Sequence, residues 1–154
     1  MTMDRGEVAD RLEIRDLIDH YATAVDARDA DAFAGLFLPK GTLVVYEPGV
    51  EEPVVEFTGT EQLRRVMDLV TAFAETFHVM ANHRSRVAGD TATGETYCLA
   101  HHLTEQGDDA EDLVMFIRYH DTYVRTEDGW RFDTRQVRRA WTEVHRAGRM
   151  PLQL

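Results

Sequence analysis

The second half of the chain has the pattern of four long β-strands joined by short turns. In these segments the three- and four-residue spacing of apolar residues that marks a helix is lost, and β-branched and aromatic residues become frequent. The gaps between them consist mainly of glycine and acidic residues, and they are too short for the crossover connection that parallel neighbours require. The sequence therefore predicts an antiparallel meander. Its strands are expected over 78–88, 91–105, 113–126 and 130 to about 145.

Helical patterns come before these strands. In the stretch 12–37, apolar residues recur on one side of a helix up to Val25, a polar link follows, and an apolar pattern restarts at Phe33. This predicts a helix, a short link and a second short helix. A third helix is expected from about Thr58 to Thr76, with short strands at 42–46 and 54–57 before it. Helices first and strands afterwards indicate an α+β domain.

The later strands are apolar on both faces. In the third of them, Leu113, Met115, Ile117 and Tyr119 alternate with further apolar residues, whereas a sheet covered by helices on one side is normally polar on the other. A second subunit covering the outer face would explain the pattern, which predicts a homo-oligomer. A sheet that is covered on both faces within one subunit is the alternative.

Composition limits the class of protein. A length of 154 residues predicts a single domain over 1–154. The net charge of −11 argues against nucleic acid or a membrane surface as a partner, and no apolar run reaches the length of a membrane span. The first residues lack the apolar core of a signal peptide, and the single cysteine, Cys98, cannot form an internal disulfide. A cytoplasmic location is therefore expected.

Acid–base chemistry by a histidine and a carboxylate is the mechanism that remains once the common sequence motifs have been searched for. The chain has no zinc-binding pattern, phosphate-binding glycine loop or serine-hydrolase elbow, so we expect no metal and no cofactor. A histidine with a carboxylate partner suits proton abstraction beside a carbonyl, elimination of water or halide, or double-bond migration. The chain has seven histidines, and the residues alone do not pair Asp26 with any of them.

Several segments spread over nearly the whole chain resemble the SnoaL-like branch of the NTF2-like superfamily. They are Tyr21, Val25-Asp26, the segment 29–37, the segment 76–82 around His78, the segment 89–94 and the closing segment 128–132. Within that branch the chain is most similar to the group of scytalone dehydratase, hexachlorocyclohexane dehydrochlorinase and bile-acid 7α-dehydratase. The resemblance implies a cone-shaped barrel, in which a curved, mixed but mostly antiparallel sheet wraps around about three N-terminal helices and encloses an apolar pocket. The usual oligomeric state of this group favours a trimer over a dimer.

The resemblance also implies roles for individual residues. Asp26 and His78 match the catalytic dyad of the group, and the expected substrate-binding positions are Tyr21, Tyr46, His102, Arg118 and His120. Choosing His102 over its neighbour His101 depends on the resemblance alone, because adjacent strand residues point to opposite faces. Tyr21 is also expected to serve as a core aromatic residue that reaches the rim of the pocket.

Arginines in the last two strands complete the set of candidates. Arg118 is the one arginine expected inside the pocket. Arg131, Arg135, Arg138 and Arg139 are expected mostly at solvated positions, with one of them available for a carboxylate or thioester.

The leading hypothesis is a cofactor-independent lyase or isomerase that acts on an apolar small molecule of the polyketide, steroid or terpenoid type. His78 would remove a proton and Asp26 would polarise His78. The alternative from another class is a noncatalytic binding or assembly module with the same fold. A polyketide cyclase and an epoxide hydrolase are further alternatives, and the second of these needs another carboxylate and an arginine in the pocket.

Overall fold

The computed structural model describes residues 4–107 and 109–148, so one residue of the predicted turn at 106–109 lies outside the described part. Four helices are present in these ranges: α1 (Arg5–Asp26), α2 (Ala30–Gly35), α3 (Thr60–Arg64) and α4 (Val66–Val70). The strands are β1 (Phe37–Tyr46), β2 (Val55–Thr58), β3 (Glu75–Ala88), β4 (Thr91–Gln106), β5 (Asp109–Thr126) and β6 (Gly129–Ala147).

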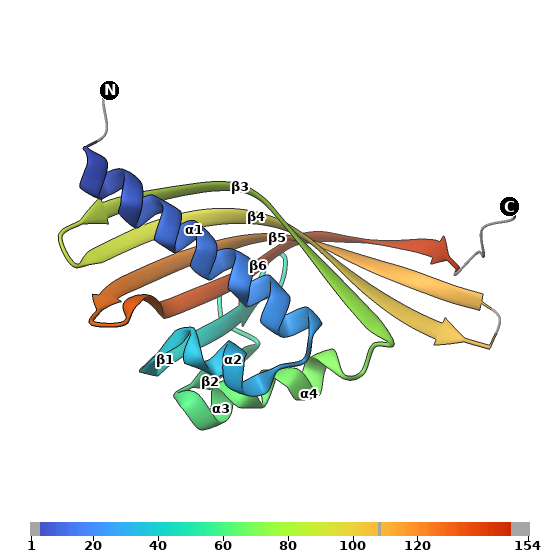
Figure 1. The fold of residues 1–154 in the computed structure, drawn as a ribbon. Coiled ribbons are helices and arrows are strands. Elements are labelled where there is room, and N and C mark those ends of the chain that lie inside the picture. Colours follow the sequence, from blue (N-terminus) through green and yellow to red (C-terminus); the bar gives the residue numbers. More distant parts are fainter. Residues whose placement is uncertain (1–3, 108, 149–154) are drawn as a thin grey trace, which may run out of the picture.

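The strands form one curved, unclosed sheet in the order β2-β1-β6-β5-β4-β3 (Figure 1). The predicted antiparallel meander is confirmed, since β3 to β6 pair in sequence order, each antiparallel to the next. In the part of the chain that the structure describes, the one parallel pair joins β1 to β6, which makes the sheet mixed. Pairing with β6 brings residues near position 45 beside residues near position 137. The predicted α+β fold, with a mixed and mostly antiparallel sheet, is therefore confirmed.

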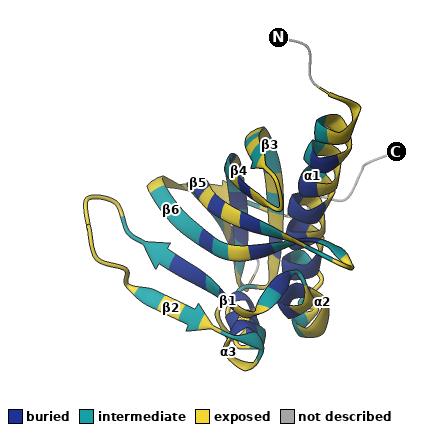
Figure 2. Ribbon diagram, turned by 90° about the vertical axis from the view of Figure 1, so that its left-hand side faces the viewer, coloured by how far each residue is buried: buried dark blue, intermediate teal, exposed yellow. Residues whose placement is uncertain are grey.

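Helix α1 crosses the sheet diagonally and turns one side toward it (Figures 1 and 2). Its buried residues include Ile14, Ile18 and Val25, which share one side of the helix as the spacing predicts. The helix ends because Arg28 adopts a positive φ of 55°, and Asp29 then caps α2 by accepting a hydrogen bond from the backbone N–H of Ala32 at 2.9 Å. The guanidinium of Arg28 donates to the carbonyl of Phe73 at 2.9 Å, which fastens the end of α1 beside the start of β3.

The third predicted helix is replaced by two shorter ones. Its apolar positions Leu63, Val66 and Val70 are buried at helical spacing, but the helical structure ends at Val70. The backbone N–H of Ala74 donates to the carbonyl of Leu103 at 2.8 Å, and β3 begins at the next residue. Sheet pairing thus takes up residues that local spacing assigned to a helix, because tertiary contacts override weak local preferences.

Arg135 is fully buried, which corrects its expected position in solvent. Its Nε and Nη2 donate to the two carboxylate oxygens of Asp121 at 2.9 Å each, and Tyr123 donates its hydroxyl to the same carboxylate at 2.8 Å. The guanidinium lies 4.1 Å from the ring centroid of Tyr21 and 4.0 Å from that of Tyr119. A bidentate ion pair and aromatic faces compensate for burying the charge.

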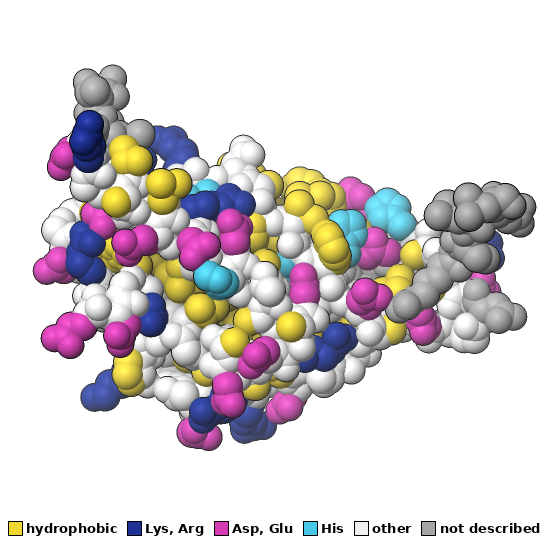
Figure 3. Space-filling model, viewed as in Figure 1, with side chains coloured by type: hydrophobic (Ala, Val, Ile, Leu, Met, Phe, Trp, Pro, Cys, Tyr) yellow, Lys and Arg dark blue, Asp and Glu magenta, His cyan; other side chains and the backbone are white. Residues whose placement is uncertain are grey.

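The outer face of the sheet has a row of apolar residues across four strands. Val79, Leu99, Phe116 and Trp141 are register partners in β3, β4, β5 and β6, and Trp141 stacks on Phe116 with ring centroids 4.3 Å apart. Trp141 is 52% exposed. Figure 3 shows hydrophobic side chains gathered next to histidines near the middle of the molecule. The homo-oligomer, with a trimer favoured, stays a prediction. Among the described residues, no helix is long and apolar enough to span a membrane.

Replacing Arg135 alone should strongly destabilise the fold. Arg135→Met leaves the carboxylate of Asp121 buried without its cation, so we expect the free energy of unfolding to fall by about 3–5 kcal/mol. The double variant Arg135→Met/Asp121→Leu removes both charges and should recover much of that loss. Urea unfolding at pH 7 measures both variants. An equal loss in the two would show that the charge imbalance is not the cause.

Candidate active site

Asp26 lies in the last turn of α1, where three hydrogen bonds fix its carboxylate. Its Oδ1 accepts from the hydroxyl of Thr76 at 2.9 Å and from Nδ1 of His78 at 2.7 Å. Its Oδ2 accepts from the backbone N–H of His78 at 2.9 Å. One carboxylate therefore holds both the main chain and the ring at the start of β3.

The geometry assigns the tautomer of His78. A carboxylate accepts hydrogen bonds, so Nδ1 of His78 carries the proton and Nε2 of the neutral ring keeps its lone pair. The side chain of His78 is only 7% exposed and lines a cavity of about 200 Å³. An imidazole lone pair in an apolar cavity, backed by a carboxylate, is suited to accept a proton from carbon.

The environment of Asp26 favours its charged form. Burial raises the pKa of this carboxyl, but the hydrogen bonds from His78 and Thr76 outweigh burial and leave the pKa below its ordinary value. Asp26 is therefore ionised at neutral pH and can stabilise an imidazolium at His78.

The cavity is lined by α1, by α4 with the residues that follow it, and by the sheet. Its walls are mostly apolar: Val25, Leu43, Val45, Val66, Val70, Phe73, Met115, Ile117 and Val137 contribute to them. The polar side chains that line it are Tyr21, Glu47, His78, His102, Tyr119 and Arg139. The cavity thus combines an apolar interior with a few hydrogen-bonding groups, the usual composition of a small-molecule site.

His102 lines the same cavity as His78. Their ring centroids are 5.7 Å apart in an edge-to-face arrangement. Nδ1 of His102 lies 3.0 Å from the carbonyl oxygen of Ala100 and 3.3 Å from that of Leu113, so it carries the proton and Nε2 is an acceptor. Burial and the neighbouring His78 lower the pKa of His102. Its neighbour His101 faces the outer side and pairs with Asp112 at 2.6 Å.

Tyr21 lines the cavity and also belongs to the core. Its ring packs on Phe33 and Tyr119, with centroids 5.2 Å and 5.6 Å away. Burial raises the pKa of Tyr21 to about 12, against the opposing effect of the Arg135 cation. The hydroxyl therefore stays protonated at neutral pH.

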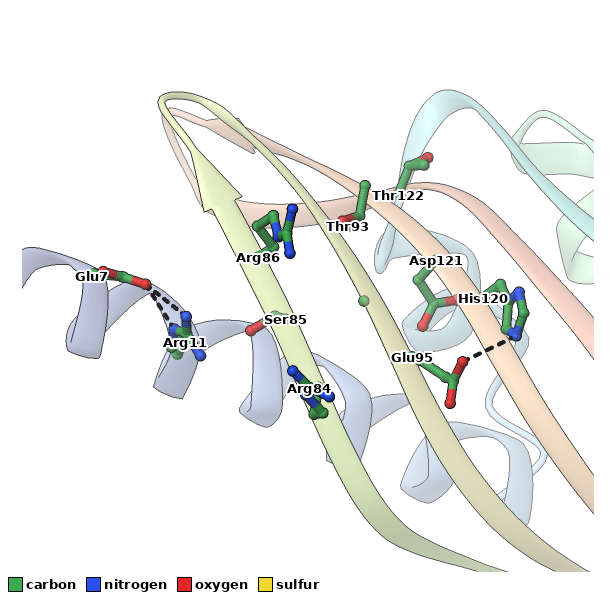
Figure 4. Close-up of a pocket in the computed structure, with 11 residues that line it drawn as sticks. Glu7, Arg11, Arg84, Ser85, Arg86, Thr93, Glu95, His120, Asp121 and Thr122 are labelled. Atoms are coloured by element: carbon green, nitrogen blue, oxygen red, sulfur yellow. Dashed lines mark hydrogen bonds and ion pairs between the residues drawn. The ribbon is translucent and has the colours of Figure 1, made fainter. Parts of the chain in front are cut away.

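Three expected substrate-binding residues do not line the cavity. The ring of Tyr46 packs beneath the guanidinium of Arg138 at 4.1 Å, and Arg118 lies exposed over Tyr97 at 4.9 Å. His120 lies in a separate polar groove of about 850 Å³, where its Nε2 is 3.4 Å from Glu95 (Figure 4). For the two residues in β5 the reason is strand parity. Ile117 and Tyr119 face inward, so the residues at 118 and 120 face outward.

Thr76 and Glu47 were not predicted as site residues, and Arg139 was expected, with three other arginines, mostly at a solvated position. Thr76 holds Asp26, while Glu47 and Arg139 form an ion pair on the cavity wall. The arginine at this wall is therefore Arg139 and not Arg118. Thr76 shares strand parity with His78, which is a usable signal once the strand is known to begin at Glu75. No comparable signal links positions 47 and 139. Within the described residues, no group of three or more His, Cys, Asp or Glu side chains is arranged to hold a metal ion.

A model of the SnoaL-like domain matches residues 6–136. The chain belongs to this family. A curated relative, protein Rv2910c of Mycobacterium tuberculosis, is 31% identical over 129 residues, which cover 82% of each chain.

Solved structures with the same SnoaL-like fold include proteins with dehydratase and dehydrochlorinase names. A scytalone dehydratase-like protein from Novosphingobium aromaticivorans superposes with a TM-score of 0.77 at 21% identity, over 92% of this chain and 91% of the other. The hexachlorocyclohexane dehydrochlorinase LinA-type3 from Novosphingobium barchaimii gives 0.76 at 20% identity, over 96% and 97%. At these identities the likeness establishes the fold.

Asp26 should make the stability of the protein depend on acid pH. Its pKa is lowered in the folded state, so its interactions stabilise the fold above the ordinary value of 3.8 and are lost as the pH falls through the folded-state pKa. We expect the stability advantage of the wild type over Asp26→Asn to shrink as urea unfolding is repeated from pH 7 down to pH 3. Asp16→Asn, an exposed change on the same helix, is the control. A constant difference between wild type and Asp26→Asn would contradict the assignment.

His102 should remain neutral where an ordinary histidine becomes charged. Because its pKa is lowered from 6.5, we expect a neutral ring protonated at Nδ1 at pH 6.5. Nitrogen-15 NMR of the imidazole rings measures both the tautomer and the titration, and His102→Gln assigns the resonance. A ring protonated on both nitrogens at that pH would contradict the assignment.

Proposed function

We propose that this protein is a cofactor-independent lyase or isomerase, of dehydratase-like type, that removes a proton from carbon in a mostly apolar small molecule. The observation that carries the proposal is the dyad geometry: His78 is bonded to Asp26 through Nδ1, and its ring lines an apolar cavity. The proposal is supported by the shared fold of this chain with a scytalone dehydratase-like protein and a dehydrochlorinase.

In the proposed step, Nε2 of His78 accepts the proton of a C–H bond. The electron pair of that bond forms a double bond to the neighbouring carbon, and in an elimination the leaving group departs from that carbon with its bonding pair. Asp26 stabilises the imidazolium, helped by its place at the negative end of α1. The protonated Tyr21 hydroxyl and the Nε2 acceptor of His102 are available to orient oxygen atoms of the substrate.

Water elimination from 3-hydroxycyclohexanone to cyclohex-2-enone gives a direct test, because the conjugated product absorbs in the ultraviolet. His78→Ala and Asp26→Asn should each lower kcat by about 100-fold or more, the usual contribution of a positioned general base. Exchange of cyclohexanone α-protons in heavy water, followed by NMR, tests proton abstraction separately from elimination.

The matched control is a second His–Asp pair on the opposite face. His101 and Asp112 are 2.6 Å apart but lie outside the cavity of His78, so His101→Ala should keep full activity. Equal activity of His78→Ala and His101→Ala would refute the dyad. A folded protein that binds these ketones but neither exchanges nor eliminates would favour the noncatalytic binding module.

Epoxide hydrolysis is a second candidate, because Glu47 and Arg139 add a carboxylate and an arginine to the cavity wall. In that reaction Glu47 would take a proton from a water molecule, which attacks the epoxide carbon while the C–O bond breaks. The released alkoxide oxygen then takes that proton back from Glu47, which gives the diol. Hydrolysis of cyclohexene oxide that survives in His78→Ala but is lost in Glu47→Gln would favour this reaction over elimination.

A further inference from the structure

An ion pair lines part of the mostly apolar cavity wall. Glu47, directly after β1, and Arg139 of β6 meet through a carboxylate oxygen and Nη2. Their side chains are 32% and 24% exposed, so the pair is partly removed from water. An ion pair facing an apolar cavity costs desolvation energy, and a function in recognition accounts for its position there.

Arg139 has hydrogen-bonding capacity that its partners in the protein do not use. Its Nη1 lies 3.7 Å from the thioether sulfur of Met115, which is a weak acceptor. Its Nε is buried and, within the described residues, has no hydrogen-bond partner. Glu47 already neutralises the charge of Arg139. The weakly bonded Nη1 donor therefore suits a neutral acceptor oxygen better than a second anion.

Strand register places this donor within reach of the dyad. The Met115 that Nη1 contacts is the register partner of Ala100, which is in turn the partner of His78. Met115 and His78 are thus two strand spacings apart, about 10 Å between backbones, and the side chains narrow that gap. One six-membered ring with an oxygen substituent bridges such a distance.

The cavity volume agrees with a ligand of this size. About 200 Å³ lies below the range of roughly 300–1,000 Å³ for pockets that hold drug-sized ligands. A volume below that range favours a ligand smaller than a drug-sized molecule.

We propose that Arg139, held by Glu47, binds the carbonyl oxygen of a small neutral ketone or ester, about one six-membered ring in size, whose acidic carbon lies at His78. The inference deepens the proposed function and rests on it for the position of the acidic carbon. Arg139 then determines which substrates bind and how they are oriented, while the dyad carries out the proton transfer.

The test compares two ligands of the same shape, cyclohexanone and methylenecyclohexane, which differ in C=O against C=CH₂. Their dissociation constants are measured by NMR titration of the labelled protein. In the wild type we expect cyclohexanone to bind about tenfold more tightly, the low end of what a hydrogen bond from a charged donor contributes. His78→Ala should keep this preference, because recognition occurs at Arg139 and not at His78.

The double variant Glu47→Leu/Arg139→Met removes the ion pair without leaving an unpaired charge, and it should abolish the preference. Arg139→Lys keeps the charge but carries all its donors on one nitrogen, so it cannot hold Glu47 and a ligand in the fork geometry of a guanidinium. It should reduce the preference and serves if the double variant fails to fold. Arg138→Met is the matched control, since Arg138 is the adjacent arginine but stacks on Tyr46 outside the cavity.

Three results would overturn the inference. They are a preference for cyclohexanone that survives in both Arg139 variants, tighter binding of cyclohexanecarboxylate than of cyclohexanone, and no binding of either ring at millimolar concentration. Failure of the proposed function looks different: ligand preference would still depend on Arg139, while His78→Ala would leave exchange and elimination unchanged.

Discussion

The carboxylate of Asp26 is the interaction on which the arrangement of the cavity depends. It accepts hydrogen bonds from the hydroxyl of Thr76 and from both the backbone and the ring of His78, so it joins the end of α1 to the first residues of β3. Arg28 reinforces the junction by donating to the carbonyl of Phe73. A helix fastened at this point brings Tyr21 and Val25 to the cavity wall. The group proposed to support catalysis thus also organises the structure around it.

Much of this architecture follows from local patterns. The glycine and acidic turns predict the meander because short connections permit only antiparallel neighbours. Strand parity predicts that His101 and His102 face opposite sides, and it also explains why Arg118 and His120 point away from the cavity. The position of β3 was predicted less well: Glu75 and Thr76, which were assigned to a helix, pair with β4, and Thr76 reaches Asp26 only because of that pairing.

The rest depends on contacts between distant segments, which local patterns do not encode. Glu47 and Arg139 meet because β1 pairs in parallel with β6, and neither residue stands in a motif. Arg135 looks like a solvated strand residue until Asp121 and the rings of Tyr21 and Tyr119 are placed around it. From its sequence alone a charged residue is predicted to be exposed, because its burial is favourable only when the fold supplies partners for the charge.

Two His–Asp pairs on opposite faces of the sheet illustrate why residue type alone does not define the site. His78–Asp26 and His101–Asp112 have nearly the same separation, 2.7 Å and 2.6 Å. His78 is 7% exposed in a cavity, whereas His101 is 35% exposed on the outer face. Water competes for a proton and screens charge at the exposed pair, but an apolar wall strengthens the attraction between an imidazolium and its carboxylate. Sheet curvature, which encloses one face and leaves the other open, therefore distinguishes two pairs that are chemically alike.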